Sequence, residues 1–370
     1  MLTSLKISVL ASAVALAATL TSCSSGGGSP APSSAASSAA PLSQAQLTAG
    51  SRHEKGLLIF SNALPSQMHV VIKAFEAKYP WIHVTATDDE DAVVFSKYAA
   101  EHATGTRSAD ILVASAPGLW VHAVSSGLLQ PFTPAGISDF PRFVSQGRGL
   151  YVFSPDPAIT IYNKILLKGH APPATIAQIA QGAVAKKYKV ATYSINNFFG
   201  YSAFYGYVHK YGWAALDKLG RMATAVGDGD VIGQDVGQGG FAVGVFESGL
   251  ARGAIETVPA DRKLLGWEYT RDFTPLIPRG IGITAGAASH DSARLFLDFV
   301  FSSSGQQALC DAGFEATSNT FTPANGCPNT LKALYAAVGG PQHTYMTPFT
   351  RQVASGQAAF TARFRQAFHQ

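Results

Sequence analysis

The sequence has little charge and lacks the patterns that most enzymes and nucleic-acid-binding proteins carry. Charged residues make up 14% of the 370 residues, and the basic ones are scattered without arginine-rich runs, so nucleic acid is not an expected partner. None of the ten histidines stands four positions from another and H-E-x-x-H is absent, which argues against a zinc site. Neither a nucleophile elbow nor a phosphate-binding loop occurs. We therefore expect no catalytic residue, no metal and no cofactor.

Long hydrophobic runs are also lacking, and no segment beyond the N-terminus has the length of a membrane span. The N-terminus carries Lys6 and then an uninterrupted small and apolar run over 7–20, which has the length of a signal-peptide core. Two small residues, Thr and Ser, directly precede Cys23. This lipobox predicts a signal peptide over 1–22 and a lipid anchor on Cys23. An ordinary secretory signal with an incidental cysteine is the alternative.

The segment after Cys23 is free of charge over 24–51 and consists largely of Ser, Ala, Gly and Pro. Such a composition cannot bury enough apolar surface to offset the entropy of ordering, so we expect a flexible tether over 23–55. The remaining chain is rich in apolar and aromatic residues and long enough for two lobes with packed cores. The sequence thus predicts an extracytoplasmic protein that is lipid-anchored to the cell membrane.

The two other cysteines, Cys310 and Cys327, are 17 positions apart in a protein expected outside the cytoplasm. An oxidising compartment favours a disulfide between them, which would add about 3 kcal/mol of stability by closing the loop. Two free thiols are the alternative. A metal pair is disfavoured because no histidine is near enough in the sequence to complete the coordination shell.

Apolar runs alternate with helical stripes in the first part of the remaining chain. The run over 57–60 is typical of a buried strand, and apolar residues at i, i+3, i+4 and i+7 over 68–75 predict a helix on a sheet. This order indicates a mostly parallel, doubly wound α/β sheet. The further elements expected here are strands over 82–86 and 110–114 and helices over 92–102 and 119–125.

A second lobe is predicted between two crossing strands. The strand over 158–163 is expected to enter this lobe and the strand over 280–283 to return from it. We therefore assign 56–160 and 277–370 to lobe 1, with the C-terminal part packing on that lobe, and 161–276 to lobe 2. The expected elements of lobe 2 are helices over 175–185 and 200–211 and strands over 189–193 and 241–246, and an amphipathic helix over 291–303 follows the return.

Several segments match a known family in their order along the chain. Besides the lipobox and tether, they are AFEAKYP over 74–80, ADILVASAPG over 109–118, IYNKILL over 161–167 and the long return segment over 269–309. In this order the chain resembles the extracellular solute-binding proteins of ABC importers, in the group that carries ferric iron, phosphonates and related small anions. The resemblance implies a type II periplasmic-binding-protein-like fold of two doubly wound α/β lobes joined by hinge strands. It also implies a monomer without enzyme activity that passes a small-molecule solute to a membrane permease.

The candidate ligand-binding residues follow predicted strands or precede predicted helices. Ligands of doubly wound sheets lie at the carboxyl ends of strands, and the resemblance places the solute between the lobes. Helix N-termini favour anions, so we expect a small anionic or zwitterionic solute. Ser61, Ser115 and Asn197 have a second interpretation as helix N-caps. The candidates are Ser61, Asn62, Asp88, Glu90, Ser115 and Ala116 in lobe 1 and Tyr162, Asn196, Asn197, Tyr201 and Glu247 in lobe 2.

One departure from the family pattern concerns iron. Ferric-binding members hold the ion with adjacent tyrosines, whereas this chain has Phe246 and Glu247 at that place, and neither can supply a phenolate. Glu247 and the acidic loop could instead pair with an amine on the ligand. A ferric-iron or chelate receptor stays an alternative, as does a non-transporting envelope lipoprotein with a cleft filled by side chains. An envelope hydrolase would need a base–nucleophile pair that the sequence does not show.

Overall fold

In the computed structural model of the protein, the described residues are 42–370. The predicted signal peptide, Cys23 and the first part of the predicted tether lie outside the described residues. None of the helices within 42–370 combines the length and the apolar character that a membrane span requires.

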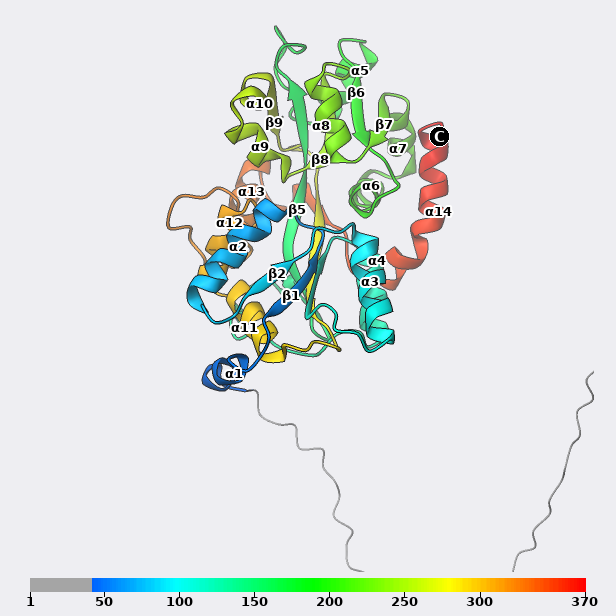
Figure 1. Cartoon of the computed structure of the whole chain (residues 1–370). Helices are drawn as coiled ribbons and strands as arrows, with labels where there is room; N and C mark the ends of the chain where they lie inside the picture. Colours follow the sequence, from blue (N-terminus) through cyan, green and yellow to red (C-terminus); the bar gives the residue numbers. More distant parts are fainter. Residues whose placement is uncertain (1–41) are drawn as a thin grey trace, which may run out of the picture. The chain divides into compact units, whose positions relative to one another are not determined.

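The first lobe is built on the parallel strands β1, β2 and β3, and helices flank them on both sides (Figure 1). Neighbouring residues of one strand therefore enter different cores: Ile59 packs with the helices α2 and α11, and Phe60 packs with α3 and α4. This arrangement explains why the strands read as continuous apolar runs. The elements are β1 (Leu57–Ser61), α2 (Pro65–Lys78), β2 (Val84–Ala86), α3 (Asp91–Ala103), β3 (Ile111–Ala114), α4 (Pro117–Ser125), α11 (His290–Val300) and α12 (Ser303–Asp311).

Two long strands connect the lobes. The first half of β5 (Leu150–Asn163) pairs antiparallel with β10 (Thr274–Ile283), whereas its second half, from Ala158, pairs with β8 and β9 of the second lobe. On its other edge, β10 pairs antiparallel with β3. The predicted crossing over 158–163 is confirmed as the second half of β5. The predicted return over 280–283 is the C-terminal end of β10. This strand begins earlier in the sequence than predicted and is buried between strands along its whole length.

The second lobe has its own sheet, in which β8 pairs with β5 on one edge and with β6 on the other. Neither β7 nor α8 was predicted from the sequence, because glycines at 227, 229, 233 and 237 are typical of turns. Asp228 caps α8 by accepting from the Val231 N–H at 3.1 Å. The elements are α5 (Ile176–Val184), β6 (Val190–Tyr193), α6 (Phe198–Tyr211), α7 (Trp213–Gly220), β7 (Ala223–Gly227), α8 (Gly229–Gly237), β8 (Val243–Ser248), α9 (Ala251–Thr257), α10 (Pro259–Leu264) and β9 (Leu265–Glu268).

The predicted tether extends too far. Within it, α1 (Gln44–Ser51) is a helix whose N-cap, Ser43, accepts from the Gln46 N–H while the Gln46 side chain accepts from the Ser43 N–H. This capping box starts the helix, and Leu47 is buried in the same core as the residues of α2 and α11. The figures show α1 beside α11. A composition typical of a linker thus hides one short, docked helix.

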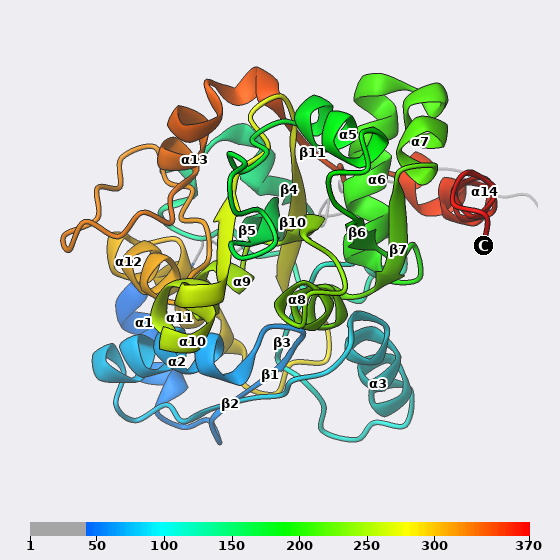
Figure 2. The same ribbon diagram turned by 90° about the horizontal axis from the view of Figure 1, so that it is seen from above.

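The C-terminal part also departs from the prediction. The last helix, α14 (Arg351–Ala367), lies beside α6 and α7 (Figure 2) and also contacts α4. Its aromatic residues belong to the core of the second lobe. Phe364 packs against Phe204 of α6 with ring centroids 4.6 Å apart. The assignment of all residues over 277–370 to lobe 1 is therefore wrong for α14, because its apolar stripe matches a face on lobe 2. The remaining elements are β4 (Ser145–Gly147), α13 (Leu331–Val338), β11 (Thr344–Met346) and three short 3-10 turns.

A disulfide joins Cys310, at the end of α12, to Cys327, with the two Cα atoms 6.1 Å apart. The predicted pairing is therefore present in the structure. The disulfide closes the loop between α12 and α13. Cys310 is fully buried, whereas Cys327 lies in this loop.

Candidate functional site

A cavity of about 900 Å³ lies between the two lobes. The first lobe contributes the loops that follow β1, β2 and β3, and the second lobe contributes the ends of β6 and β8 and one side of α8. Parallel strands bring their carboxyl ends to one edge of a sheet, which is why loops distant in sequence meet here. The volume lies within the range that holds a small-molecule ligand.

The cavity brings together six of the eleven predicted ligand residues. They come from both lobes, and they are Asn62, Asp88, Glu90, Ser115, Asn197 and Glu247. Of the three predicted N-caps, only Asn197 caps a helix through its side chain, by accepting from the Gly200 N–H at 2.7 Å at the start of α6. Asn197 therefore combines a structural role with a place in the cavity wall.

The other five predicted residues do not line the cavity. The Ser61 hydroxyl turns back to accept from the Ala63 N–H, and Ala116 is fully buried where α4 begins. Asn196 points to the C-terminal helix and accepts from Arg365, whereas the Tyr201 hydroxyl donates to the Val353 carbonyl. The Tyr162 ring packs beneath Gly266 of β9. These five residues were predicted because they lie next to cavity-lining residues in the sequence. Whether a side chain points into the cavity depends on tertiary packing.

Asp91 joins the first-lobe loops, although it was not among the predicted ligand residues. Its carboxylate accepts from the Asn62 side-chain amide and from the Ser115 N–H, both at 2.6 Å. Desolvation raises the pKa of Asp91 to about 6, and the nearby Arg279 opposes this rise. The three loops are therefore held together by one carboxylate.

Arg279, on β10, is a second lining residue that sequence analysis missed, because it lies inside an apolar strand. Its guanidinium pairs with Asp156 of β5 at 2.8 Å and also donates to the Asn62 side-chain oxygen. Both charged groups are buried, with Arg279 4% and Asp156 1% exposed. The positive charge of Arg279 is thus already paired inside the protein.

Glu247 reaches the cavity through an irregular strand end. In a regular strand Phe246 would share a face with Gly244, which lies against Ile232 of α8. Instead, the register of β8 shifts opposite Ile159, Phe246 adopts a positive φ of 63°, and its ring packs on Phe204 of α6. Positive φ is costly for a bulky residue and is retained mainly at functional sites. The bulge leaves Glu247 to line the cavity.

Glu247 is 2% exposed. Its Oε1 accepts from the Ser248 N–H at 2.9 Å, and its Oε2 has no hydrogen-bond partner within residues 42–370. Burial is the main reason that its pKa rises to about 8, and the negative charges of Asp230 and Asp228 add to the rise.

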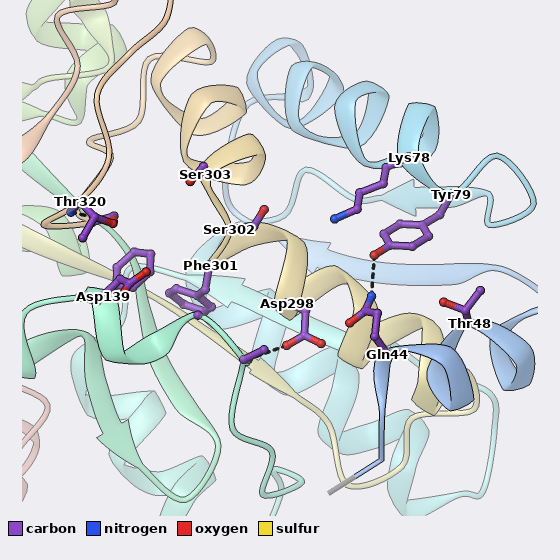
Figure 3. A pocket seen from close by; sticks show the side chains of 14 residues that line it. Gln44, Thr48, Lys78, Tyr79, Asp139, Asp298, Phe301, Ser302, Ser303 and Thr320 are labelled. Atoms are coloured by element: carbon purple, nitrogen blue, oxygen red, sulfur yellow. Dashed lines mark hydrogen bonds between the residues drawn. The ribbon is translucent and has the colours of Figure 1, made fainter.

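A second cavity, of about 570 Å³, lies on the outer side of the first lobe (Figure 3). Gln44 of α1 donates to the Tyr79 hydroxyl at 2.8 Å, and Asp298 accepts from the Ala135 N–H at 2.8 Å. Every residue of its wall belongs to α1 or the first lobe, so movement of the lobes would not enclose a ligand there. The inter-lobe cavity is therefore the candidate solute site.

Comparison with known proteins gives the same fold. The substrate-binding protein of an ABC transporter from Agrobacterium tumefaciens is 21% identical, with a TM-score of 0.73 over 85% of this chain and 96% of that chain. Iron-bound HitA from Pseudomonas aeruginosa is 14% identical, with a TM-score of 0.66 over 84% and 99%. AfuA from Actinobacillus pleuropneumoniae, with fructose-6-phosphate bound, is 18% identical, with a TM-score of 0.64 over 85% and 98%.

The predicted type II periplasmic-binding-protein-like fold is thus confirmed. No curated protein sequence matches the chain. Residues 62–307, more than half of the chain, match the family model of the bacterial extracellular solute-binding proteins. The chain therefore belongs to the bacterial extracellular solute-binding protein family.

Proposed function

We propose that the protein captures a small solute between its lobes and delivers it to the permease of an ABC importer. The observation that carries this proposal is the cavity of about 900 Å³ whose wall comes from both lobes. A solute that contacts both walls binds best when the lobes are close, so its binding favours the closed arrangement. A permease that recognises this arrangement would accept the loaded protein in preference to the empty one.

Family membership supports transport rather than catalysis, and the lipobox supports a position at the membrane surface. A lipid on Cys23 would keep the receptor beside its permease. The open cavity argues against the alternative of a non-transporting module, which requires a cleft filled by side chains. The ferric-iron alternative is less well supported, because Phe246 and Glu247 stand where ferric-binding members have adjacent tyrosines.

The proposal is tested with full-length protein purified in detergent. Small molecules that stay bound through purification are identified by mass spectrometry, and a solute panel is screened by thermal unfolding. A solute present at a hundred times its Kd should stabilise the protein by about 2.7 kcal/mol. If no molecule co-purifies and no solute of any charge raises the unfolding temperature, the protein is not a solute receptor.

A further inference from the structure

We infer that the solute is a small organic cation and that its ammonium group lies against Glu247. This inference names the solute class and rests on the function proposed above.

The charge of the cavity differs in sign from the charge of the chain. The whole chain has a formal net charge of +4, yet eight of its 23 acidic residues line this cavity. Among the lining residues, all within 42–370, Arg279 is the only Lys or Arg, and Asp156 already pairs with it. An anionic solute would meet this acidic wall without a free cation to receive it. The acidic residues are Asp88, Asp89, Glu90, Asp91, Asp228, Asp230, Glu247 and Asp261.

An acidic cluster alone can be a solvated surface, and Glu247 supplies the independent sign of a ligand. Its side chain is almost fully buried, and Oε2 has no donor from the described part of the chain. An unsatisfied buried carboxyl oxygen is costly, and an N–H group of a ligand would satisfy it. Because the pKa of Glu247 is about 8, its carboxyl group is protonated in the empty protein at neutral pH, and a cation beside Oε2 would favour loss of that proton. The hydroxyl of Ser115, on the opposite wall, is 2% exposed and also has no partner within 42–370.

The surroundings of Glu247 favour a positive charge over a neutral donor. Asp228 and Asp230 lie near enough for their charges to act on Glu247, and a cation between them would offset this repulsion. A Cβ on Gly229 would lie 2.4 Å from Glu247 Oε1 and 2.6 Å from the Tyr193 hydroxyl. Glycine at this position therefore lets the carboxylate and the phenol lie side by side at the start of α8.

An organic cation fits this wall better than a metal ion does. Tyr193 and Phe199 both line the cavity and stack with ring centroids 4.7 Å apart, and aromatic faces attract ammonium groups. The carboxylates are spread over both walls instead of gathered around one point, in keeping with the lack of a metal-holding cluster in the described residues. Because both lobes carry negative charge, a cation between them also reduces the electrostatic cost of closing the lobes.

The test compares probes that are matched in size and differ in charge. Putrescine and spermidine are the cations; 1,4-butanediol is the neutral match and succinate the anionic match of putrescine. Binding to full-length protein in detergent is measured by isothermal titration calorimetry at low ionic strength. We expect at least one ammonium probe to bind, more weakly at high salt, and neither butanediol nor succinate to bind.

Variants locate the charge at Glu247. Glu247→Gln should weaken the bound ammonium probe roughly 10- to 100-fold, and Asp230→Asn, on the exposed rim, about two- to fivefold. Asp235→Asn is the matched control, because Asp235 is on the same helix, α8, but does not line the cavity. Its affinity should be unchanged. Circular dichroism checks that each variant is folded. If the Glu247 variant does not fold, the loss of affinity is measured with the Asp230 variant.

Two results separate this inference from the proposed function. If succinate or butanediol binds and the ammonium probes do not, the charge inference is overturned and the solute receptor stands. If no probe of any charge binds, the inference is overturned, and the mass-spectrometric search decides whether the protein binds another solute. Equal affinity losses in the Glu247, Asp230 and Asp235 variants would also overturn the assigned role of Glu247.

Discussion

Arg252 of α9 and Glu315, which follows α12, form a buried ion pair between the two lobes, with Nη2 and Oε1 2.7 Å apart. Arg252 is 5% exposed and Glu315 is fully buried. Arg252 also donates to the Gly249 carbonyl at 2.7 Å and to the Tyr269 hydroxyl. The pair thus lies in a low-dielectric site where removal of one charge leaves the other without compensation.

The perturbation is Arg252→Met, which keeps the length of the side chain and removes its charge. With an effective dielectric constant of about 20, two unit charges at this distance attract by roughly 6 kcal/mol before desolvation is counted. For Glu315, burial outweighs this attraction, because its pKa is raised in spite of Arg252. Breaking such a pair from one side typically costs about 3–5 kcal/mol, and we expect that loss here.

The assay is urea unfolding followed by tryptophan fluorescence and by circular dichroism, since coincident transitions test two-state behaviour in a two-lobed protein. The control is Arg271→Met, because Arg271 pairs with Glu268 at 4.0 Å on the surface, with the Arg271 side chain 62% exposed. A surface pair of this kind contributes about 0–1 kcal/mol. The double variant Arg252→Met/Glu315→Leu should recover most of the lost stability, since apolar replacements remove both buried charges.

Two results would refute this reasoning. In the first, Arg252→Met costs no more than Arg271→Met, which would mean that the inter-lobe pair is solvated in solution. In the second, the double variant loses as much free energy of unfolding as the variants Arg252→Met and Glu315→Leu lose together, which would mean that the two charges do not interact.

Three further predictions concern pH, the disulfide and the anchor. Glu247 has a pKa of about 8 in the folded protein and an ordinary value near 4.5 when unfolded, so the folded state holds the extra proton between these values. Stability should therefore fall as the pH rises from about 4.5 to about 8 and then level off, and urea unfolding of Glu247→Gln should lack this part of the slope; an unchanged slope would contradict the raised pKa. Replacing Cys310 and Cys327 with serine should lower the free energy of unfolding by about 3 kcal/mol, and a reducing agent should have no further effect on that variant. Cys23→Ala should move the protein from the membrane fraction to the soluble fraction with unchanged solute affinity, and a loss of both would show that the anchor is not a separate module.

Much of the first lobe could be predicted from the sequence, because its strands and helices follow from local periodicity. The apolar run that became β1 and the helical stripe that became α2 each depend on residues only a few positions apart. The second lobe was harder to predict. The glycines in and around α8 are typical of turns, so they conceal the helix. Gly244 of β8 lies against Ile232 of α8, where a larger side chain would not fit. Close approach of two elements is a tertiary requirement that local composition does not reveal.

The site was predicted in part for the same reason. Residues such as Asn62 and Ser115 follow strands whose ends a doubly wound sheet must bring together, so topology alone places them at the cavity. The outward turn of Tyr201 and Asn196 depends on the docking of α14, whose place on the second lobe results from long-range aromatic packing. Likewise, Arg279 enters the cavity wall from within an apolar strand only because β10 lies between β3 and β5.

The sequence by itself determined the elements of the first lobe, the predicted anchor at Cys23 and the family, since each depends on short segments in a set order. The tertiary structure decided the charge of the cavity. Its eight carboxylates come from segments around residues 90, 230, 247 and 261, and their combined field exists only once both lobes have folded. The bulge at Phe246 then decides that Glu247, which any strand pattern would leave ambiguous, lies in that field, and its Oε2 has no hydrogen-bond partner within residues 42–370.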